Sequence, residues 1–236
     1  MSNLNLINMP KIIIALDFYD KKKAMKLVHI LNPSMFYLKV GKEMFTIFGY
    51  KLIQELHKLG FRIFLDLKFH DIPNTVFNAV KAAADLGVWM ISVHASGGKN
   101  MLIAAKKALK SFKKAPLLIA VTVLTSFNQQ ELKDIGVNLS LKEYIFLLSK
   151  LANRCGLDGI VCPGNEARRI KTFFGKEYKI ITPGIRCSTD YSHDQNNVIT
   201  PKKAKDFKID YIVIGRSITM SKNPKNKLNE IINSMK

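Results

Sequence analysis

The chain has 236 residues, 47% of them hydrophobic, so it can bury one large core or two ordinary ones. It has no run of about 18 apolar residues, which argues against a membrane-spanning helix, and segment 1–10 lacks the basic and apolar regions of a signal peptide. Lysine and arginine outnumber aspartate and glutamate by 37 to 18, and the resulting net charge of +19 favours an anionic partner or substrate.

Strand-like and helix-like segments alternate along the whole chain. The apolar runs predict strands over residues 11–16, 35–40, 61–67, 88–93, 116–124, 159–162, 178–182 and 211–214. Helical periodicity and stop signals predict helices over residues 20–31, 43–59, 75–86, 97–110, 128–135, 140–155, 166–174, 201–207 and 225–235.

Eight apolar strands, each followed by helical segments, predict an α/β fold, a (β/α)8 TIM barrel with parallel strands. A doubly wound sheet is the alternative, but no G-x-G-x-x-G motif follows the first strand. No linker is visible, so we expect residues 1–236 to form a single domain.

Three ionisable residues, Asp66, Lys68 and Asp71, follow one another at the end of the third expected strand. Asp66 and Lys68 are two residues apart, so in an extended strand their side chains leave the same face. Two nearby carboxylates favour a charged ammonium, whereas an attacking lysine must be neutral. Lys68 is therefore better suited to donating a proton than to acting as a nucleophile. A surface salt-bridge cluster is the plain alternative.

In a barrel of this kind, the active site forms at the C-terminal ends of the strands. Asp17 and Lys39 end the first two expected strands and extend an alternation of charge across the barrel mouth. Other polar residues at strand ends are His94, Thr125, Arg186 and Arg216. Each of these residues alone is more simply a solvated loop residue, but together they predict a site.

The loops after strands seven and eight commonly bind phosphate in this fold. Gly215 allows close approach of the backbone to an anion, and Arg216 supplies a bidentate donor. Arg186 follows Gly184 in a similar combination. The polar segment 187–197 is expected to be a mobile loop that closes over the phosphate and brings Gln195 to it. The alternative for Gly215 and Arg216 is a helix start with a surface arginine.

Other residues carry no chemical signal. His70 and His94 are interpreted as packing or hydrogen-bonding residues, and no spacing of His, Cys and Asp predicts a zinc site. The three cysteines, Cys155, Cys162 and Cys187, lack a C-x-x-C pair and are expected to be reduced thiols of a cytoplasmic protein.

The segment DLKFHDIPNT at 66–75 resembles the signature of the bacterial type of orotidine 5′-phosphate decarboxylase. Other segments resemble motifs of that family in the family's order: IALD at 14–17, LKVG at 38–41, VTVLTS at 121–126, TPGIR at 182–186 and IGR at 214–216. The resemblance covers almost the whole chain. It implies conversion of orotidine 5′-monophosphate to UMP and CO₂, the last step of de novo pyrimidine synthesis, without a metal or cofactor.

The resemblance also implies roles for individual residues. Lys68 would stabilise and protonate the carbanion at C6 of the pyrimidine, and Asp66 would lie near the substrate carboxylate. The other implied substrate contacts are Asp17 and Lys39 at the ribose, Thr125 at the pyrimidine, and Arg186, Gln195, Gly215 and Arg216 at the phosphate. Asp71, Ile72 and Thr75 are similar to residues that the family contributes across a two-fold interface, which implies a homodimer with shared sites.

Two other readings remain open from the sequence. Related barrel enzymes that act on sugar phosphates share a D-x-K-x-x-D segment but use Mg²⁺, which carboxylates can hold, so EDTA sensitivity would separate them. A basic RNA-binding protein would lose RNA affinity steeply with salt. The lysines are scattered without a nucleic-acid-binding motif, so a general lysine bias is the simpler cause and no specific nucleic acid is expected.

Overall fold

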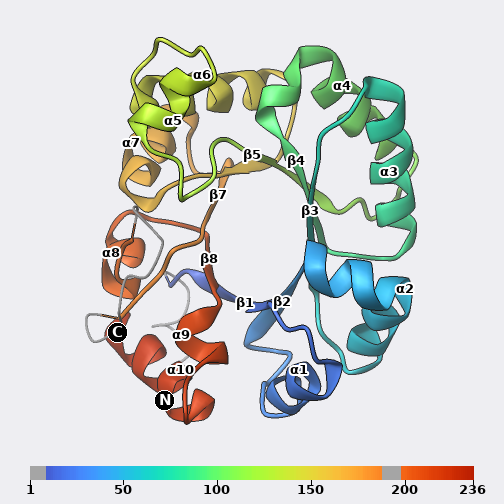
Figure 1. Ribbon diagram of the computed structural model, residues 1–236, viewed down its shortest axis with the longest axis vertical. Helices are drawn as coiled ribbons and strands as arrows, with labels where there is room; N and C mark the ends of the chain where they lie inside the picture. Colours follow the sequence, from blue (N-terminus) through green and yellow to red (C-terminus); the bar gives the residue numbers. More distant parts are fainter. Residues whose placement is uncertain (1–8, 188–197) are drawn as a thin grey trace.

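The computed structural model describes residues 9–187 and 198–236, and their strands form a closed parallel barrel in sequence order (Figure 1). The last strand pairs with the first, Ile12 beside Ile212, which closes the ring. The strands are β1 Lys11–Leu16, β2 Phe36–Gly41, β3 Ile63–Phe69, β4 Met90–His94, β5 Leu117–Val121, β6 Gly159–Val161, β7 Lys179–Thr182 and β8 Tyr211–Ile214. The predicted TIM barrel is confirmed.

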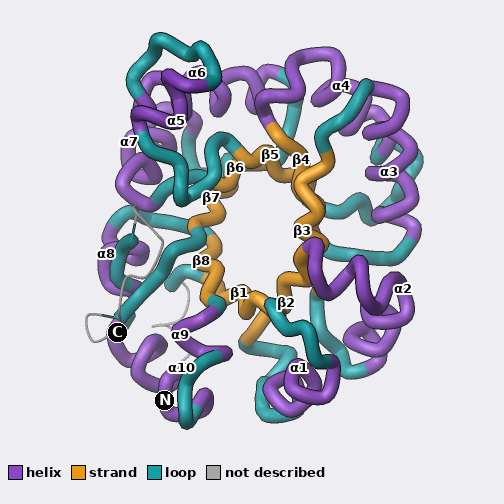
Figure 2. Tube along the Cα trace, in the orientation of Figure 1, coloured by secondary structure: helices purple, strands orange, loops and turns teal. Residues whose placement is uncertain are grey.

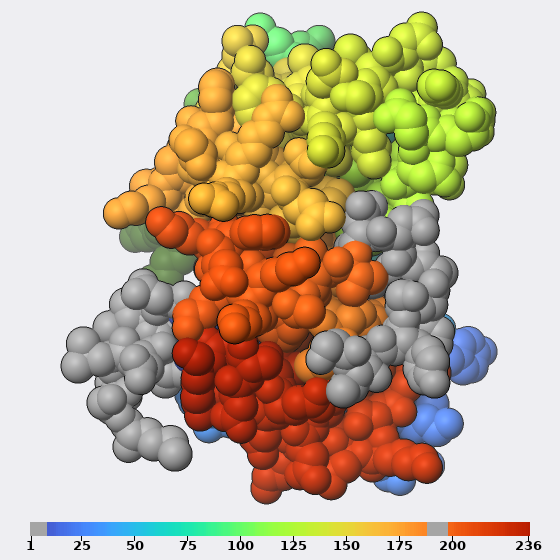
Figure 3. All heavy atoms as spheres, turned by 90° about the vertical axis from the view of Figure 1, so that its left-hand side faces the viewer, coloured from blue at the N-terminus to red at the C-terminus, as the bar shows by residue number. Residues whose placement is uncertain are grey.

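Helices surround the ring of strands on the outside (Figure 2). They are α1 Lys21–Val28, α2 Lys42–Lys58, α3 Pro73–Asp85, α4 Gly98–Ala108, α5 Gln129–Asp134, α6 Leu141–Arg154, α7 Gly164–Phe174, α8 Pro201–Asp206, α9 Arg216–Thr219 and α10 Pro224–Ser234, with a 3₁₀ turn, η2, at Ala95–Gly97. Seen from the side, successive segments of the second half of the chain cover one flank of the barrel down to α10 (Figure 3). None of the helices in the described ranges is long and apolar enough to cross a membrane.

The two faces of each strand supply two separate cores. On β1, Ile12, Ile14 and Leu16 pack outward against the helices, whereas Ile13 and Ala15 pack into the barrel interior. Strand residues that are apolar on both faces are typical of parallel sheets covered by helices. The alternation fixes which side chains reach the barrel axis and therefore which can form a site at its mouth.

Local signals explain where several helices begin. Ser140 caps α6 in a reciprocal capping box with Glu143, and Asn128 does the same for α5 with Glu131. Pro73 occupies the first turn of α3, directly after Ile72, as expected from its missing N–H. Cys155 and Cys162 are free cysteines, in agreement with the expected thiols.

One departure from the expected elements that bears on the site is in β3. The sequence predicts a strand over 61–67, but β3 runs from Ile63 to Phe69 and includes Lys68. Its pairing with β4 is irregular, because Leu65 lies beside Ile91 and Phe69 beside Val93. An advance of four residues along β3 therefore corresponds to an advance of two residues along β4, so β3 contains a bulge.

Candidate active site

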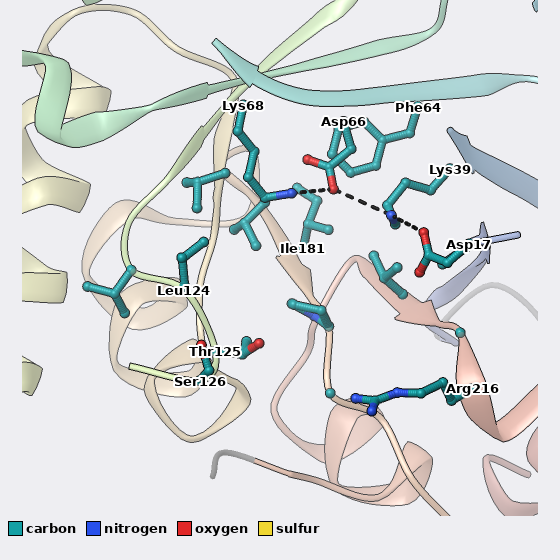
Figure 4. A pocket seen from close by; sticks show the side chains of 18 of the residues that line it. Asp17, Lys39, Phe64, Asp66, Lys68, Leu124, Thr125, Ser126, Ile181 and Arg216 are labelled. Atoms are coloured by element: carbon teal, nitrogen blue, oxygen red, sulfur yellow. Dashed lines mark hydrogen bonds and ion pairs between the residues drawn. The ribbon is translucent and has the colours of Figure 1, made fainter. Parts of the chain in front are cut away.

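A cavity of about 340 Å³ lies at the C-terminal mouth of the barrel (Figure 4). Its size is within the range of small-molecule sites. Apolar residues of several strands, among them Phe64, Ile181 and Val213, form part of its wall. The predicted site residues that also line it are Asp17, Lys39, Asp66, Lys68, Thr125, Arg186, Gly215 and Arg216. The fold thus brings together residues from six strand ends.

Four charged side chains form a row of alternating sign along one wall (Figure 4). Lys68 Nζ lies 2.7 Å from Asp66 Oδ2, and the same oxygen is 3.7 Å from Lys39 Nζ. Lys39 Nζ is in turn 3.2 Å from Asp17 Oδ1. The expected alternation is confirmed for these four residues, and each charge holds its neighbour in place.

Asp66 is the buried member of this row, with 6% of its surface exposed. Burial by itself raises the pKa of a carboxyl group, but the ammonium groups of Lys39 and Lys68 and hydrogen bonds from Lys68 and Ser92 outweigh that effect and lower the pKa of Asp66. Asp66 is therefore an anion at neutral pH and fixes a negative charge beside Lys68.

The backbone at Lys68 is unusual. Its φ angle is +53°, in the left-handed region that costs a residue with a side chain about 1–2 kcal/mol. The backbone N–H of Lys68 donates to Ser92 Oγ at 2.9 Å. The same hydroxyl donates to Asp66 Oδ1 at 2.8 Å. A residue of β4 thus contacts both the strained backbone and the buried carboxylate.

Arg216, Gly215, Gly184 and Arg186 lie on the side of the cavity formed by the ends of β7 and β8. Gly184 has φ +76°, a conformation that glycine adopts without a steric penalty. Arg186 is buried, and its Nη1 donates to the carbonyl of Ile185 at 2.9 Å. In Figure 4 Arg216 lies across the cavity from Lys68. The two arginines give this end a positive charge that suits an anion.

A model of the "Orotidine 5'-phosphate decarboxylase / HUMPS family" matches residues 10–231 of this sequence, and the site just described lies within that range. The chain belongs to this family.

Relatives and solved structures agree with that assignment. An orotidine 5′-phosphate decarboxylase of Buchnera aphidicola (subsp. Acyrthosiphon pisum, strain 5A) is 75% identical over 235 residues and covers 100% of both chains. One from Salmonella paratyphi A is 51% identical over 95% of this chain and 92% of its own. The crystal structure of orotidine 5′-phosphate decarboxylase from Lactobacillus acidophilus is 36% identical with a TM-score of 0.84, covering 96% of this chain and 99% of that one. The resemblance inferred from the sequence is confirmed.

Three predicted site residues are not among the described residues that line the cavity. Asp71, Ile72 and Thr75 are exposed at the start of α3, and Ile72 is 66% exposed. The carboxylate of Asp71 accepts a hydrogen bond from the N–H of Ile72. The expected row of alternating charges therefore does not extend to Asp71 within one chain. Gln195 and most of segment 187–197 lie outside the described residues.

Two histidines lie next to each other after β3 and at the end of β4: His70 is exposed and His94 is partly buried. The rings of His70 and His94 are 5.4 Å apart between centroids. Burial, together with the nearby His70 and Lys68, lowers the pKa of His94 to about 4. His94 is therefore neutral at physiological pH and adds no positive charge beside Lys68.

Within residues 9–187 and 198–236, no group of three or more His, Cys, Asp or Glu side chains is arranged to hold a metal ion. The carboxylates of Asp17 and Asp66 each contact a lysine ammonium instead. A divalent cation at this wall would have to compete with those ammonium groups.

Sequence reasoning missed Ser92, although a signal was present. Ser92 is a polar residue in the apolar strand β4, two residues after Met90, whose side chain faces the barrel interior. Period-two alternation therefore turns Ser92 toward the same interior. What the sequence lacked was the register between β3 and β4, which brings the hydroxyl to Asp66.

Proposed function

We propose that the protein decarboxylates orotidine 5′-monophosphate to UMP and CO₂ in pyrimidine biosynthesis. The observation that carries this proposal is the row of alternating charges from Lys68 to Asp17, whose Lys68 end lies across the cavity from Arg216, in a chain of this family. A ligand with a phosphate at one end and a reacting carboxylate at the other fits such a cavity.

In the proposed reaction the bond between C6 and the carboxylate carbon breaks and its electron pair stays on C6. CO₂ leaves, and C6 takes a proton from Lys68 Nζ, which solvent then replaces. The preorganised ammonium favours the charge that develops at C6 without reorganising during the reaction. Asp66 holds Lys68 through the 2.7 Å contact and lies near the substrate carboxylate. Repulsion between the two carboxylates is a second, debated contribution.

The remaining residues bind the substrate away from C6. Asp17 and Lys39, 3.2 Å apart, hold the ribose hydroxyls, and Thr125 contacts the pyrimidine. Arg216, the backbone at Gly215 and Arg186 bind the phosphate. Binding of the phosphate takes place away from C6, so this remote binding energy assists the chemical step. The residues assigned here supply charge stabilisation and the proton themselves, so the proposed mechanism uses no cofactor.

The exposed residues Asp71, Ile72 and Thr75 complete the pocket of a second copy. They lie next to β3 in sequence and are exposed, yet they do not line the cavity of their own chain, which a two-fold homodimer with shared sites would explain.

Replacement of Lys68 tests this function. Lys68→Ala should lower kcat for orotidine 5′-monophosphate by about 10⁴-fold or more, because both charge stabilisation and proton donation are lost. Affinity for UMP should change little, since the phosphate and ribose contacts remain. Turnover is followed by the absorbance change with EDTA present, and UMP affinity by calorimetry.

Lys106→Ala is the matched control, because Lys106 also forms a close ion pair, 2.8 Å from Asp158, but does not line the cavity. It should keep normal turnover. Near-normal activity of Lys68→Ala would contradict the assigned role. If the unaltered protein does not turn over orotidine 5′-monophosphate but acts on a sugar phosphate with Mg²⁺, the chain belongs with the sugar-phosphate enzymes instead.

A further inference from the structure

Ser92 is fully buried in β4, at 0% exposure, and is not among the residues that line the cavity. Its hydroxyl nevertheless contacts two parts of the active site on the neighbouring strand β3. It accepts from the backbone N–H of Lys68 at 2.9 Å and donates to Asp66 Oδ1 at 2.8 Å. The Ser92 hydroxyl therefore links the Asp66 carboxylate, which contacts the Lys68 ammonium, to the backbone of Lys68 itself.

The directions of these two hydrogen bonds are fixed by chemistry. A serine hydroxyl has one hydrogen, and a backbone N–H can only donate. Since Oγ accepts from Lys68, its own hydrogen goes to Asp66, whose ionised carboxylate is an acceptor. The two oxygens of Asp66 are thus divided, with Oδ1 on Ser92 and Oδ2 on Lys68 and Lys39. This division sets the plane of the carboxylate.

The same hydroxyl lies at the irregular part of the sheet. The bulge between Leu65 and Phe69 places Lys68 at φ +53°. Strained backbone of this kind persists only where surrounding contacts hold it. Ser92 supplies such a contact from β4, because its hydroxyl binds the N–H of the strained residue itself.

We propose that Ser92 is a positioning residue for the decarboxylation, which holds the Asp66 carboxylate and the left-handed backbone of Lys68 in one fixed relation so that Lys68 Nζ is presented at C6. The inference rests on the proposed roles of Lys68 and Asp66. Ser92 touches no substrate, so its effect is on the geometry of the chemical step rather than on binding.

The test compares Ser92→Ala with Ser92→Thr, which keeps the hydroxyl, and with Ser149→Ala. Ser149 is an equally buried serine whose hydroxyl donates within α6 to the carbonyl of Ile145 at 2.7 Å, away from the cavity. It controls for the loss of one buried hydroxyl hydrogen bond. Lys68→Ala belongs in the same series.

Ser92→Ala should lower kcat by about 10- to 100-fold, as expected when a catalytic group is misplaced, with KM and UMP affinity within about twofold of normal. The hydrogen bond from Ser92 lowers the pKa of Asp66, so its removal should move the acid limb of the kcat profile to higher pH. Ser92→Thr should recover most of the rate, and Ser149→Ala should be normal.

A kcat of Ser92→Ala within twofold of normal would overturn the proposal, as would a threonine variant as slow as the alanine variant. If the unaltered protein does not turn over orotidine 5′-monophosphate, the proposed function itself fails, and if Lys68→Ala stays active, the role of Lys68 on which the inference rests fails. If Lys68→Ala is inactive while Ser92→Ala is normal, only the role of Ser92 fails.

Discussion

Asp66 is the residue at which opposing electrostatic effects meet. Burial favours its neutral form, and two lysines with two hydrogen bonds favour the anion, so its pKa is lowered. For a carboxyl group with a lowered pKa, the stabilisation is present above its unfolded pKa and is lost as the pH falls through the folded value. The charge row is therefore intact at neutral pH and breaks only in acid, when Asp66 is protonated.

Arg216 allows a prediction about the phosphate. Arg216→Ala should lower kcat/KM for orotidine 5′-monophosphate by about 100-fold or more, because a charged, bidentate contact is lost. The nucleoside orotidine has no phosphate, so its slow decarboxylation should be nearly unaffected. Steady-state rates with both substrates measure the difference.

Arg169→Ala is the control, since Arg169 is an exposed arginine that stacks 4.3 Å from the ring centre of Phe146 on the outer helices. It removes the same charge and should leave both substrates unaffected. Equal losses for nucleotide and nucleoside in Arg216→Ala would mean that Arg216 does not act through the phosphate.

At the scale of the elements, most of the barrel could be read from the sequence, because apolar strands and periodic helices carry strong local signals. The strand order and the mouth residues Asp17, Lys39, Asp66 and Lys68 follow from that reading. The bulge in β3 and the contact with Ser92 do not, since they depend on register between strands distant in sequence. The short helix α9 begins at Arg216, where the sequence offered a helix start only as the alternative to a phosphate site, because four residues hold too little periodicity.

Two aspartates make equivalent contacts at the opposite, N-terminal end of the barrel. Asp158 directly precedes β6 and accepts from the N–H of Leu118 in β5 and from Lys106 of α4. Asp210 directly precedes β8 and accepts from the N–H of Ile180 in β7 and from Lys171 of α7. Each carboxylate ties a strand to its neighbour and to an outer helix. Charged residues at this end of the fold serve stability rather than catalysis.

Asp210→Ala should therefore lower the free energy of unfolding by about 2–4 kcal/mol, because it leaves a largely buried lysine and a backbone N–H without their charged partner. Urea unfolding measures this loss, and kcat of the folded protein should stay normal. Asp206→Ala, at an exposed position of α8, is the control and should change stability by less than about 0.5 kcal/mol. A loss of activity in Asp210→Ala without a loss of stability would contradict the structural role.

For the whole molecule, the net charge of +19 and the cavity act at different ranges. The overall charge attracts anions in general, including nucleotides and polyanions. The cavity at the barrel mouth selects among these anions, because Arg216 and the charged residues from Asp17 to Lys68 line it together. The family match over residues 10–231 includes this cavity, which accounts for an anionic substrate. The lysine excess therefore does not require a nucleic-acid-binding function.

The proposed dimer makes a quantitative prediction. If a site uses Lys68 of one copy and Asp71 of the other, Lys68→Ala and Asp71→Asn should each be nearly inactive alone. In a hybrid of the two variants, one of its two sites contains both normal residues. Half of the dimers are hybrids after equal mixing and exchange, so about one quarter of normal activity should return.

A mixture of Lys68→Ala with Asp66→Asn is the control for this experiment. Both residues line the cavity of their own chain, so every site of a hybrid keeps one defect and no activity should return. Recovery in the first mixture alone requires that Asp71 act in a neighbouring chain's site. No recovery in either mixture, with subunit exchange verified by mass spectrometry, would mean that each site is built from one chain, and that the exposed start of α3 serves another purpose.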